Sequence, residues 1–323
     1  MTMEQSLISN VTPVFITRDI SEEYCANFTK EDLHAAHNIN ISSAAFCALI
    51  VLVGTSANAF VIWINVFRME STFRSVLSLN LFISGFISSS FLILNIVYFA
   101  SDIHWPFQSF MCRLNNFMFH LNMFLSAFML ILYSIDYCFV VLSPLRYNIY
   151  RRPSLASREA LIAWIIAIGV SIPYFIFKDT VNCQETTKCL DVFGNLETTM
   201  FRNRRHKSMV IMAFMLGYCI PFIIIFICSV TAAIIYQQKK TSKYTPALRL
   251  IFITQAFFAF CWLPYHAVSF TERFSSVSAE VVGPIMISLA SLSSCVNPIL
   301  YACLSPDFKK AFSVQVFFNK HLK

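Results

Sequence analysis

Seven long apolar stretches dominate this chain and limit what it can fold into. They lie near residues 43–67, 76–100, 110–142, 160–178, 208–236, 247–271 and 281–303. Each reaches the roughly 20 residues that an α-helix needs to cross the hydrocarbon core of a bilayer. Only 13% of the 323 residues are charged, whereas a soluble domain carries about 25%. We therefore predict an all-α integral membrane protein, a seven-transmembrane helix bundle with its two termini on opposite sides of the membrane.

The positions of lysine and arginine predict the orientation of this bundle. They gather in the connections between the first and second, third and fourth, and fifth and sixth stretches, and in the C-terminal tail. Cytoplasmic segments are enriched in these residues, so we expect a multi-pass plasma-membrane protein with an extracellular N-terminus. The net charge of +7 belongs to this membrane face, and we expect no nucleic-acid partner. The sequons NVT, NFT and NIS agree, because they offer glycan acceptors at Asn10, Asn27 and Asn40.

Four cysteines fall in the segments expected outside the cell, where the environment is oxidising. Cys25 lies in the N-terminal tail, Cys112 at the start of the third stretch, and Cys183 and Cys189 in the loop before the fifth. A disulfide from Cys112 to Cys183 or Cys189 would hold that loop over the bundle. We favour Cys189, which would leave Cys183 available for Cys25.

Short motifs follow one another along the apolar stretches in a specific order. They are GTSAN, SLNLFISG, CIPFIIIF, FCWLPYH and SSCVNPILY, followed by SPDFKKAF. In this order and spacing the chain resembles the rhodopsin-like (class A) G-protein-coupled receptors. HWPF, LSPLRY, SIPYFIF and CWLPYH are most similar to its chemoattractant group of formyl-peptide, anaphylatoxin and chemerin-like receptors. The resemblance implies a glycosylated tail at 1–42, a seven-transmembrane receptor domain at 43–303, and a short amphipathic eighth helix with a cytoplasmic tail at 304–323.

Two prolines and their neighbours carry the switching role that the resemblance implies. Pro264 and Pro298 each remove a backbone hydrogen bond within a membrane helix and create a bend. Trp262 lies just before the first bend, where a ligand that presses on its ring can rotate the inner half of the helix. Asn297 and Tyr301 are four residues apart and share one helical face. The alternative is that these residues only shape helix packing.

The triplet Asp136-Tyr137-Cys138 departs from the family pattern, in which arginine follows the acid and extends toward the G protein. Tyrosine lacks the fixed charge and the forked donors of a guanidinium. Gly85 stands where an aspartate usually binds sodium, and Ser229 where a tyrosine usually braces the active state. We expect weak or altered G-protein coupling, as in a decoy or scavenger receptor or a degenerate one. The alternative is normal coupling through other contacts.

The expected ligand site lies between the outer halves of the helices. Its candidate residues are Asn116, Phe119, His120, Phe124, Arg205, Trp262, Tyr265 and His266. Phe119 replaces the aspartate of amine receptors, so a protonated amine is disfavoured. Met209 and Ala213 stand at the depth where formyl-peptide and anaphylatoxin receptors carry arginine. We expect an extracellular peptide, small protein or anionic lipid. The alternatives are that the histidines only bond neighbouring helices and that the basic run around Arg205 is a solvated surface.

Other classes of membrane protein fit the sequence less well. Transporters tend to have repeated halves and interrupted helices, and metalloenzymes need a spaced ligand motif; neither pattern is visible. We therefore predict no enzyme activity, no cofactor and no metal site. The tail after residue 303 carries only Ser305 and Ser313 as hydroxyl residues, so we expect no phosphate cluster that would recruit arrestin tightly.

Overall fold

The computed structural model describes residues 30–143, 151–183, 186–192, 199–239, 245–271 and 276–321. Its elements are α2 (Lys30–Arg68), α3 (Phe73–Ala100), α4 (Ser109–Leu142), α6 (Pro153–Ile176), β1 (Lys178–Cys183), β2 (Thr186–Asp191), α7 (Thr199–Phe214), a π-helical segment (Met215–Cys219), α8 (Ile220–Lys239), α9 (Thr245–Thr271), α10 (Ser276–Leu304) and α11 (Pro306–His321). The π-helical segment joins α7 and α8 into one rod. Seven rods in the described ranges are long and apolar enough to cross a membrane, which confirms the predicted bundle.

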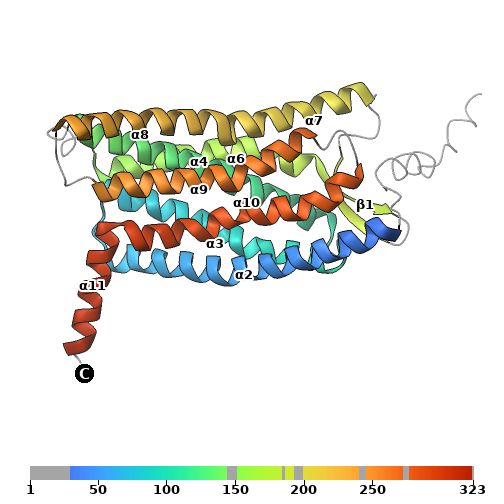
Figure 1. Ribbon diagram of the computed structural model, residues 1–323, viewed down its shortest axis with the longest axis horizontal. Coiled ribbons are helices and arrows are strands. Elements are labelled where there is room, and N and C mark those ends of the chain that lie inside the picture. Colours follow the sequence, from blue (N-terminus) through green and yellow to red (C-terminus); the bar gives the residue numbers. More distant parts are fainter. Residues whose placement is uncertain are drawn as a thin grey trace, which may run out of the picture.

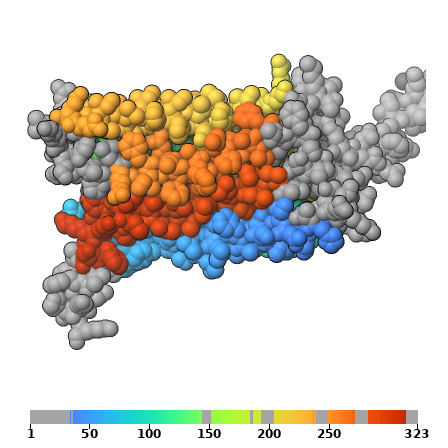
Figure 2. Space-filling model, in the orientation of Figure 1, coloured from blue at the N-terminus to red at the C-terminus, as the bar shows by residue number. Residues whose placement is uncertain are grey.

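The seven rods run side by side, with the strands at one end and α11 at the other (Figure 1). We call these the hairpin end and the α11 end. On the face shown in Figure 2, α2, α10, α9 and α8 lie next to one another. α4 is the central helix and contacts α3, α6, α8, α9 and β1. α11 leaves the bundle at a steep angle to α10, as expected for the predicted eighth helix.

Side-chain burial in the bundle follows the membrane environment. The central helix contributes Met123, Phe124 and Leu125 to a core without solvent exposure. On the outside, large apolar side chains such as Leu52 and Leu161 are exposed. Exposed apolar surface on this scale marks contact with another apolar phase, here the lipid chains. The rods therefore pack inward through one face and meet lipid with the other.

The helix ends follow local sequence signals. α3 begins after Thr72, whose side chain accepts a hydrogen bond from the backbone of Ser75, while the Ser75 hydroxyl bonds back to Thr72, a capping box. α6 begins with Pro153, whose missing N–H costs nothing at that position. α2 begins at Lys30, well before the predicted boundary at residue 43. Asn10 and Asn27 lie outside the described residues. Asn40 lies within α2 and is only 2% exposed, which argues against a glycan at that position.

The strands were not anticipated, because no secondary structure was predicted in the loop before the fifth rod. β1 and β2 form an antiparallel hairpin. The disulfide between Cys112 and Cys189 confirms the favoured pairing and attaches β2 to α4. Cys183 is also disulfide-bonded, while Cys25, its expected partner, lies outside the described residues.

Candidate functional site

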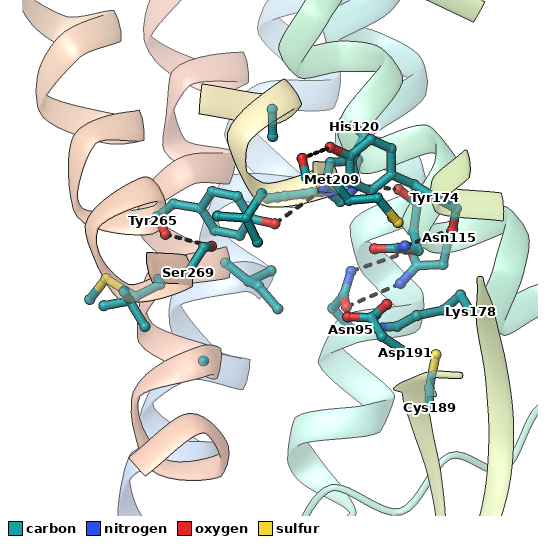
Figure 3. Close-up of a pocket in the computed structure, with 18 of the residues that line it drawn as sticks. Asn95, Asn115, His120, Tyr174, Lys178, Cys189, Asp191, Met209, Tyr265 and Ser269 are labelled. Atoms are coloured by element: carbon teal, nitrogen blue, oxygen red, sulfur yellow. Dashed lines mark hydrogen bonds and ion pairs between the residues drawn. The ribbon is translucent and has the colours of Figure 1, made fainter. Parts of the chain in front are cut away.

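A cavity of about 180 Å³ opens between the helices at the hairpin end (Figure 3). It is lined by Asn95, Tyr98 and Trp105 near α3, by Asn115, Asn116, Phe119 and His120 of α4, by Tyr174, Lys178, Cys189 and Asp191 around the hairpin, by His206, Met209, Val210 and Ala213 of α7, and by Tyr265, Val268, Ser269, Gly283, Met286 and Ile287 of α9 and α10. Residues from all parts of the chain thus meet in one chamber. We call it the hairpin-end pocket.

The hairpin is fixed over this pocket by polar contacts as well as by its disulfide. Asp179 in β1 accepts hydrogen bonds from Ser109 and from the guanidinium of Arg113, both at the start of α4. Burial raises the pKa of the Asp179 carboxyl, but the hydrogen bonds from Ser109, the Thr180 N–H and Arg113 outweigh it, and its pKa lies below the usual value. The ionised carboxylate therefore helps to hold β1 against α4.

One wall of the pocket is rich in side-chain amides. Asn95 and Asn115 donate to each other across α3 and α4, with N···O distances of 3.3 and 3.1 Å. Asn116 donates to the carbonyl of Tyr174 at 2.8 Å. An asparagine amide has two donors and an acceptor with two lone pairs, so each retains capacity beyond these bonds. The wall offers both donors and acceptors to an occupant.

A charged pair lies at the base of the hairpin. Lys178 and Asp191 are partners in the strand register, and the Lys178 ammonium lies 3.2 Å from a carboxylate oxygen of Asp191. Both side chains line the pocket, as Figure 3 shows. The pocket therefore contains an ammonium and a carboxylate that are partly open to an occupant.

His120 is the most tightly held polar group in the pocket. Its ring stacks on Tyr174 with centroids 3.6 Å apart. Its Nδ1 lies 2.9 Å from the carbonyl oxygen of Asn116, and its Nε2 lies 3.2 Å from the hydroxyl of Tyr265. His120 thus bonds both its own helix and Tyr265 of α9, and its ring also forms part of the pocket surface. Neither ring nitrogen of His266 has a hydrogen-bond partner among the described residues.

The candidate ligand residues divide into two sets. Four of them, Asn116, Phe119, His120 and Tyr265, line the hairpin-end pocket. Phe124 lies in the closed core. The other three, Arg205, Trp262 and His266, are not part of the pocket lining.

Trp262 and His266 do not line the pocket and are each 1% exposed. The Trp262 ring touches that of Phe119, with centroids 5.4 Å apart, so the pocket reaches it through one intervening side chain. Arg205 places its guanidinium 5.6 Å from the Phe177 ring centroid, while its neighbour His206 lines the cavity. A ligand in the pocket would therefore meet Phe119 rather than Trp262 itself, and the predicted pressure on Trp262 stays a prediction.

Sequence reasoning missed the amide pair Asn95 and Asn115 and the ion pair Lys178 and Asp191. Lys178 directly follows SIPYFIF, so its position as a cation at the end of the fourth apolar stretch could have identified it as a candidate site residue from the sequence. Nothing in the sequence paired it with Asp191, because that contact depends on the hairpin register.

Below Trp262 the bundle is tightly fitted. The π-helical segment contains Gly217, where an added Cβ would lie 2.8 Å from the terminal methyl of Met123 in α4. Glycine therefore permits the close approach of these two rods. Phe258 of α9 lies 6.3 Å from Trp262 by ring centroids. Such π-bulges occur frequently at functional sites, and this one lies beside the predicted switch residues.

A neutral polar layer occupies the middle of the bundle. The amide of Asn58 donates to the carbonyls of Gly54 and Ser294 at 2.8 and 2.9 Å. Its oxygen lies only 2.8 Å from the place of a Cβ at Gly85. The Asn58 amide therefore occupies the space next to Gly85, where relatives are expected to carry an aspartate. This layer contains uncharged groups at the position of the usual acid.

At the α11 end, Asp136 is fully buried. Its carboxylate lies 2.9 Å from Nε of Arg74 in α3 and 3.6 Å from Nε of Arg151, just before α6. Tyr137 is 2% exposed and packs with Val141 against Ala232 of α8. The tyrosine is thus an apolar contact between helices, and the cations beside the acid come from other elements.

Two small cavities of about 40 Å³ each lie near this end. Asn297 and Tyr301 both line the first, together with Thr254 and Gln255 of α9, which agrees with the shared face predicted for the two α10 residues. Ser229 is 2% exposed, and its hydroxyl has no hydrogen-bond partner among the described residues. The residues of the predicted coupling network thus surround the inner part of the bundle.

Known proteins resemble this chain over most of its length. The family model of the 7 transmembrane receptor (rhodopsin family) matches residues 57–301. Chemerin-like receptor 1 of Homo sapiens is 31% identical over 285 residues, 84% of this chain and 76% of the relative. Chemerin-like receptor 2 of Homo sapiens is 32% identical over 284 residues, with coverage of 85% and 79%. The C3a anaphylatoxin chemotactic receptor of Oncorhynchus mykiss is 28% identical over 286 residues, with coverage of 86% and 78%.

These similarities agree with the seven-rod bundle, the disulfide and the pocket at its hairpin end. The family is one of receptors rather than an enzyme class, and its members engage an extracellular ligand and a G protein. The chain therefore belongs to the rhodopsin-like family of G-protein-coupled receptors and, within it, to the chemoattractant type related to the chemerin receptors.

Proposed function

We propose that this receptor binds the acidic end of an extracellular peptide or small protein in its hairpin-end pocket and that its G-protein coupling is altered. The observation that carries the ligand class is the pairing of Lys178 with Asp191 beside a wall of asparagine amides. A carboxylate on the ligand would bind Lys178, and its backbone amides would exchange hydrogen bonds with the asparagines.

The charges in the pocket favour a peptide over an anionic lipid. Asp191 remains close to Lys178 and would repel a phosphate group that carries up to two negative charges. A peptide end carries one carboxylate together with N–H donors that Asp191 can accept. The basic side chains Arg204, Arg205 and Lys207 on α7 lie near the mouth of the pocket and would attract an acidic ligand over a distance.

The proposed orientation places the hairpin end outside the cell. Disulfides persist in oxidising compartments, and the described disulfide Cys112–Cys189 lies at this end. Lysine and arginine at the α11 end, including Arg74, Arg151 and Lys309, fit a cytoplasmic face. In this orientation Asn10 and Asn27 remain candidate glycosylation sites in the extracellular tail.

The altered coupling is supported by the α11 end. Tyr137 replaces the expected arginine with a side chain that packs between helices, and the neutral layer at Gly85 replaces the usual acid. A decoy or scavenger receptor would share the ligand pocket but would recruit no G protein. A receptor with altered coupling and a decoy receptor would therefore differ in their G-protein response to the ligand rather than in their affinity for it.

A ligand screen on intact cells tests this proposal. Synthetic peptides with free or amidated C-termini and anionic lipids would be added to cells that express the native receptor. Binding, G-protein dissociation and arrestin recruitment would be measured together. We expect saturable binding of peptides with a free carboxylate and a G-protein response weaker than that of human chemerin-like receptor 1 with its own ligand.

Matched variants separate the contributions of single residues. Lys178→Gln should lower the affinity for the free-acid peptide about tenfold, which corresponds to about 1.4 kcal/mol. Lys207→Gln, an exposed cation on α7, should lower it less than about twofold. Equal binding of free and amidated peptides would overturn the ligand class, and a full-strength G-protein response would overturn altered coupling.

A further inference from the structure

The buried acid of the Asp136-Tyr137-Cys138 triplet takes its cations from outside its own helix. The Asp136 carboxylate, with 0% exposure, lies between Arg74 of α3 and Arg151 before α6. A buried ionised carboxylate requires such partners, since an uncompensated charge in the protein interior is strongly unfavourable. The triplet therefore retains a guanidinium beside its acid although Tyr137 cannot supply one.

The two arginines are held differently. Arg151 is 10% exposed, and its Nη1 lies 3.2 Å from a carboxylate oxygen of Glu159. Its guanidinium carbon lies 4.4 Å from the ring centroid of Phe73, close enough for a cation–π contact. Arg151 thus binds two carboxylates and an aromatic face. These contacts hold Arg151 beside Asp136 independently of Arg74.

Arg74 is more open. Its side chain is 26% exposed, and it lines one of the two cavities at the α11 end together with Tyr137, Ile251 and Tyr301. Its guanidinium carbon lies 5.8 Å from the ring centroid of Tyr137. Arg74 therefore contacts the buried acid through its Nε and is also one of the residues that line the cavity.

Tyr137 and Ile251 both line this cavity. Ile251 belongs to α9 and packs against the cluster of Tyr137, Val141 and Ala232. A movement of α9 away from α4 would break this apolar contact and widen the opening that Arg74 borders. Arg151 would remain beside Asp136, so the acid would keep a counter-ion if Arg74 turned toward the opening.

We propose that Arg74 supplies the guanidinium that contacts the G protein, in place of the arginine that Tyr137 replaces. This inference rests on the proposed function, in which the α11 end faces the cytoplasm and some coupling remains. A guanidinium at this position would suit a group rich in acceptors on the G protein, such as a helix C-terminus, whose last four carbonyls are unpaired and where the helix dipole is negative. Guanidinium donors form strong charge-assisted hydrogen bonds with such groups.

The test uses the full-length receptor in lipid nanodiscs and purified heterotrimers of the four Gα classes, freed of nucleotide. The native chain should bind at least one class. Arg74→Gln should lower that affinity tenfold or more, and Arg74→Lys should lower it less, because a lysine keeps the charge without the fork of donors. Arg152→Gln removes an equal charge from an exposed position at the start of α6 and should change the affinity less than about twofold.

The outcomes separate this inference from the function on which it rests. If the native chain and all variants bind no heterotrimer, the proposed coupling fails and the role of Arg74 fails with it. If the native chain binds and Arg74→Gln binds equally, only the role of Arg74 is overturned. Thermal unfolding identifies a variant that does not fold. If Arg74→Gln does not fold, the heterotrimer affinity of Arg74→Lys tests the inference instead. An affinity at least threefold below that of the native chain supports the inference, and an unchanged affinity overturns it.

Discussion

The two ends of the bundle present polar groups in opposite ways. At the hairpin end, amides and a charged pair from several elements line an open chamber of about 180 Å³. At the α11 end, the strongest charge, Asp136, is buried, and the adjoining cavities measure about 40 Å³ each. One end is prepared to accept an occupant as it stands. The other must move before anything enters, as expected for a ligand site and a signalling face.

The difference follows from what holds each end together. The hairpin is joined to α4 by a disulfide and by the contacts of Asp179, so its pocket can stay open without collapse. The α11 end closes through apolar contacts of Tyr137 and through the ion pairs of Asp136. Such contacts can be exchanged, whereas the disulfide cannot.

Removing the buried acid should produce the largest effect. Asp136→Ala leaves Arg74 and Arg151 facing each other without their shared anion, which we expect to cost about 3 kcal/mol of unfolding free energy. The measurement is thermal unfolding of purified receptor. Ser134→Ala is the control on the same helix, because that hydroxyl bonds only its own helix backbone at Leu130. Equal stability of the two variants would mean that Asp136 does not hold the α11 end together.

Loss of the disulfide should destabilise the hairpin end by a similar or slightly smaller amount. Replacing Cys112 and Cys189 together by serine opens a link between positions 77 residues apart, and disulfides contribute about 2–4 kcal/mol. Ligand binding should fall with it. Cys303→Ser, at an exposed free thiol, serves as control. If the double variant unfolded at the same temperature as the native chain, polar contacts alone would be sufficient to fix the hairpin.

The neutral layer between the two ends can be probed with a pair of glycines. Gly85→Ala brings a Cβ within 2.8 Å of the Asn58 amide oxygen and should cost about 1–3 kcal/mol through overpacking. Gly169→Ala meets nothing within 4 Å and should stabilise α6 by about 1 kcal/mol through helix propensity. Thermal shifts of the same sign in both variants would contradict the tight fit around Gly85.

The smallest expected effect is a pH dependence at the hairpin end. The folded pKa of Asp179 lies below its unfolded value, which is about 3.9. Its stabilisation is therefore present above about pH 4 and is lost as the pH falls through the folded pKa. Unfolding temperatures between pH 3 and pH 6 should fall less steeply toward acid in Asp179→Asn than in the native chain. Water screens this partly exposed carboxylate, so the unfolding temperatures of the two proteins should differ only slightly in their slope against pH. Identical slopes would contradict a stabilising role of the Asp179 carboxylate.

Much of the fold could be predicted because each rod carries its own signal. Apolar length located the seven crossings, and the motif SPDFKKAF located α11. The pairing of Cys112 with Cys189 was also confirmed. The hairpin was missed because its strands carry the polar sequences KDTVNC and TTKCLD, which show no alternation of apolar residues.

The candidate site was only partly predictable. Phe119, His120 and Tyr265 were expected in the outer halves of their helices, because the position of a residue along an apolar stretch can be read from the sequence. Lys178 and Arg74 are cations near helix ends in the sequence, but their partners depend on how distant elements pack. A single sequence contains no such pairing information, so the acid beside Arg74 could be found only in three dimensions.

The central claim is that the missing cation of the Asp136-Tyr137-Cys138 triplet is replaced from α3. A double-mutant cycle tests it most directly, with heterotrimer affinity as the readout. Tyr137→Arg should raise the affinity less in the native background than in the Arg74→Gln background, since Arg74 already lies 5.8 Å from that ring. In the Arg74→Gln background the same change should restore most of the lost affinity. An equal effect of Tyr137→Arg in both backgrounds would show that the two positions act independently and would contradict the account.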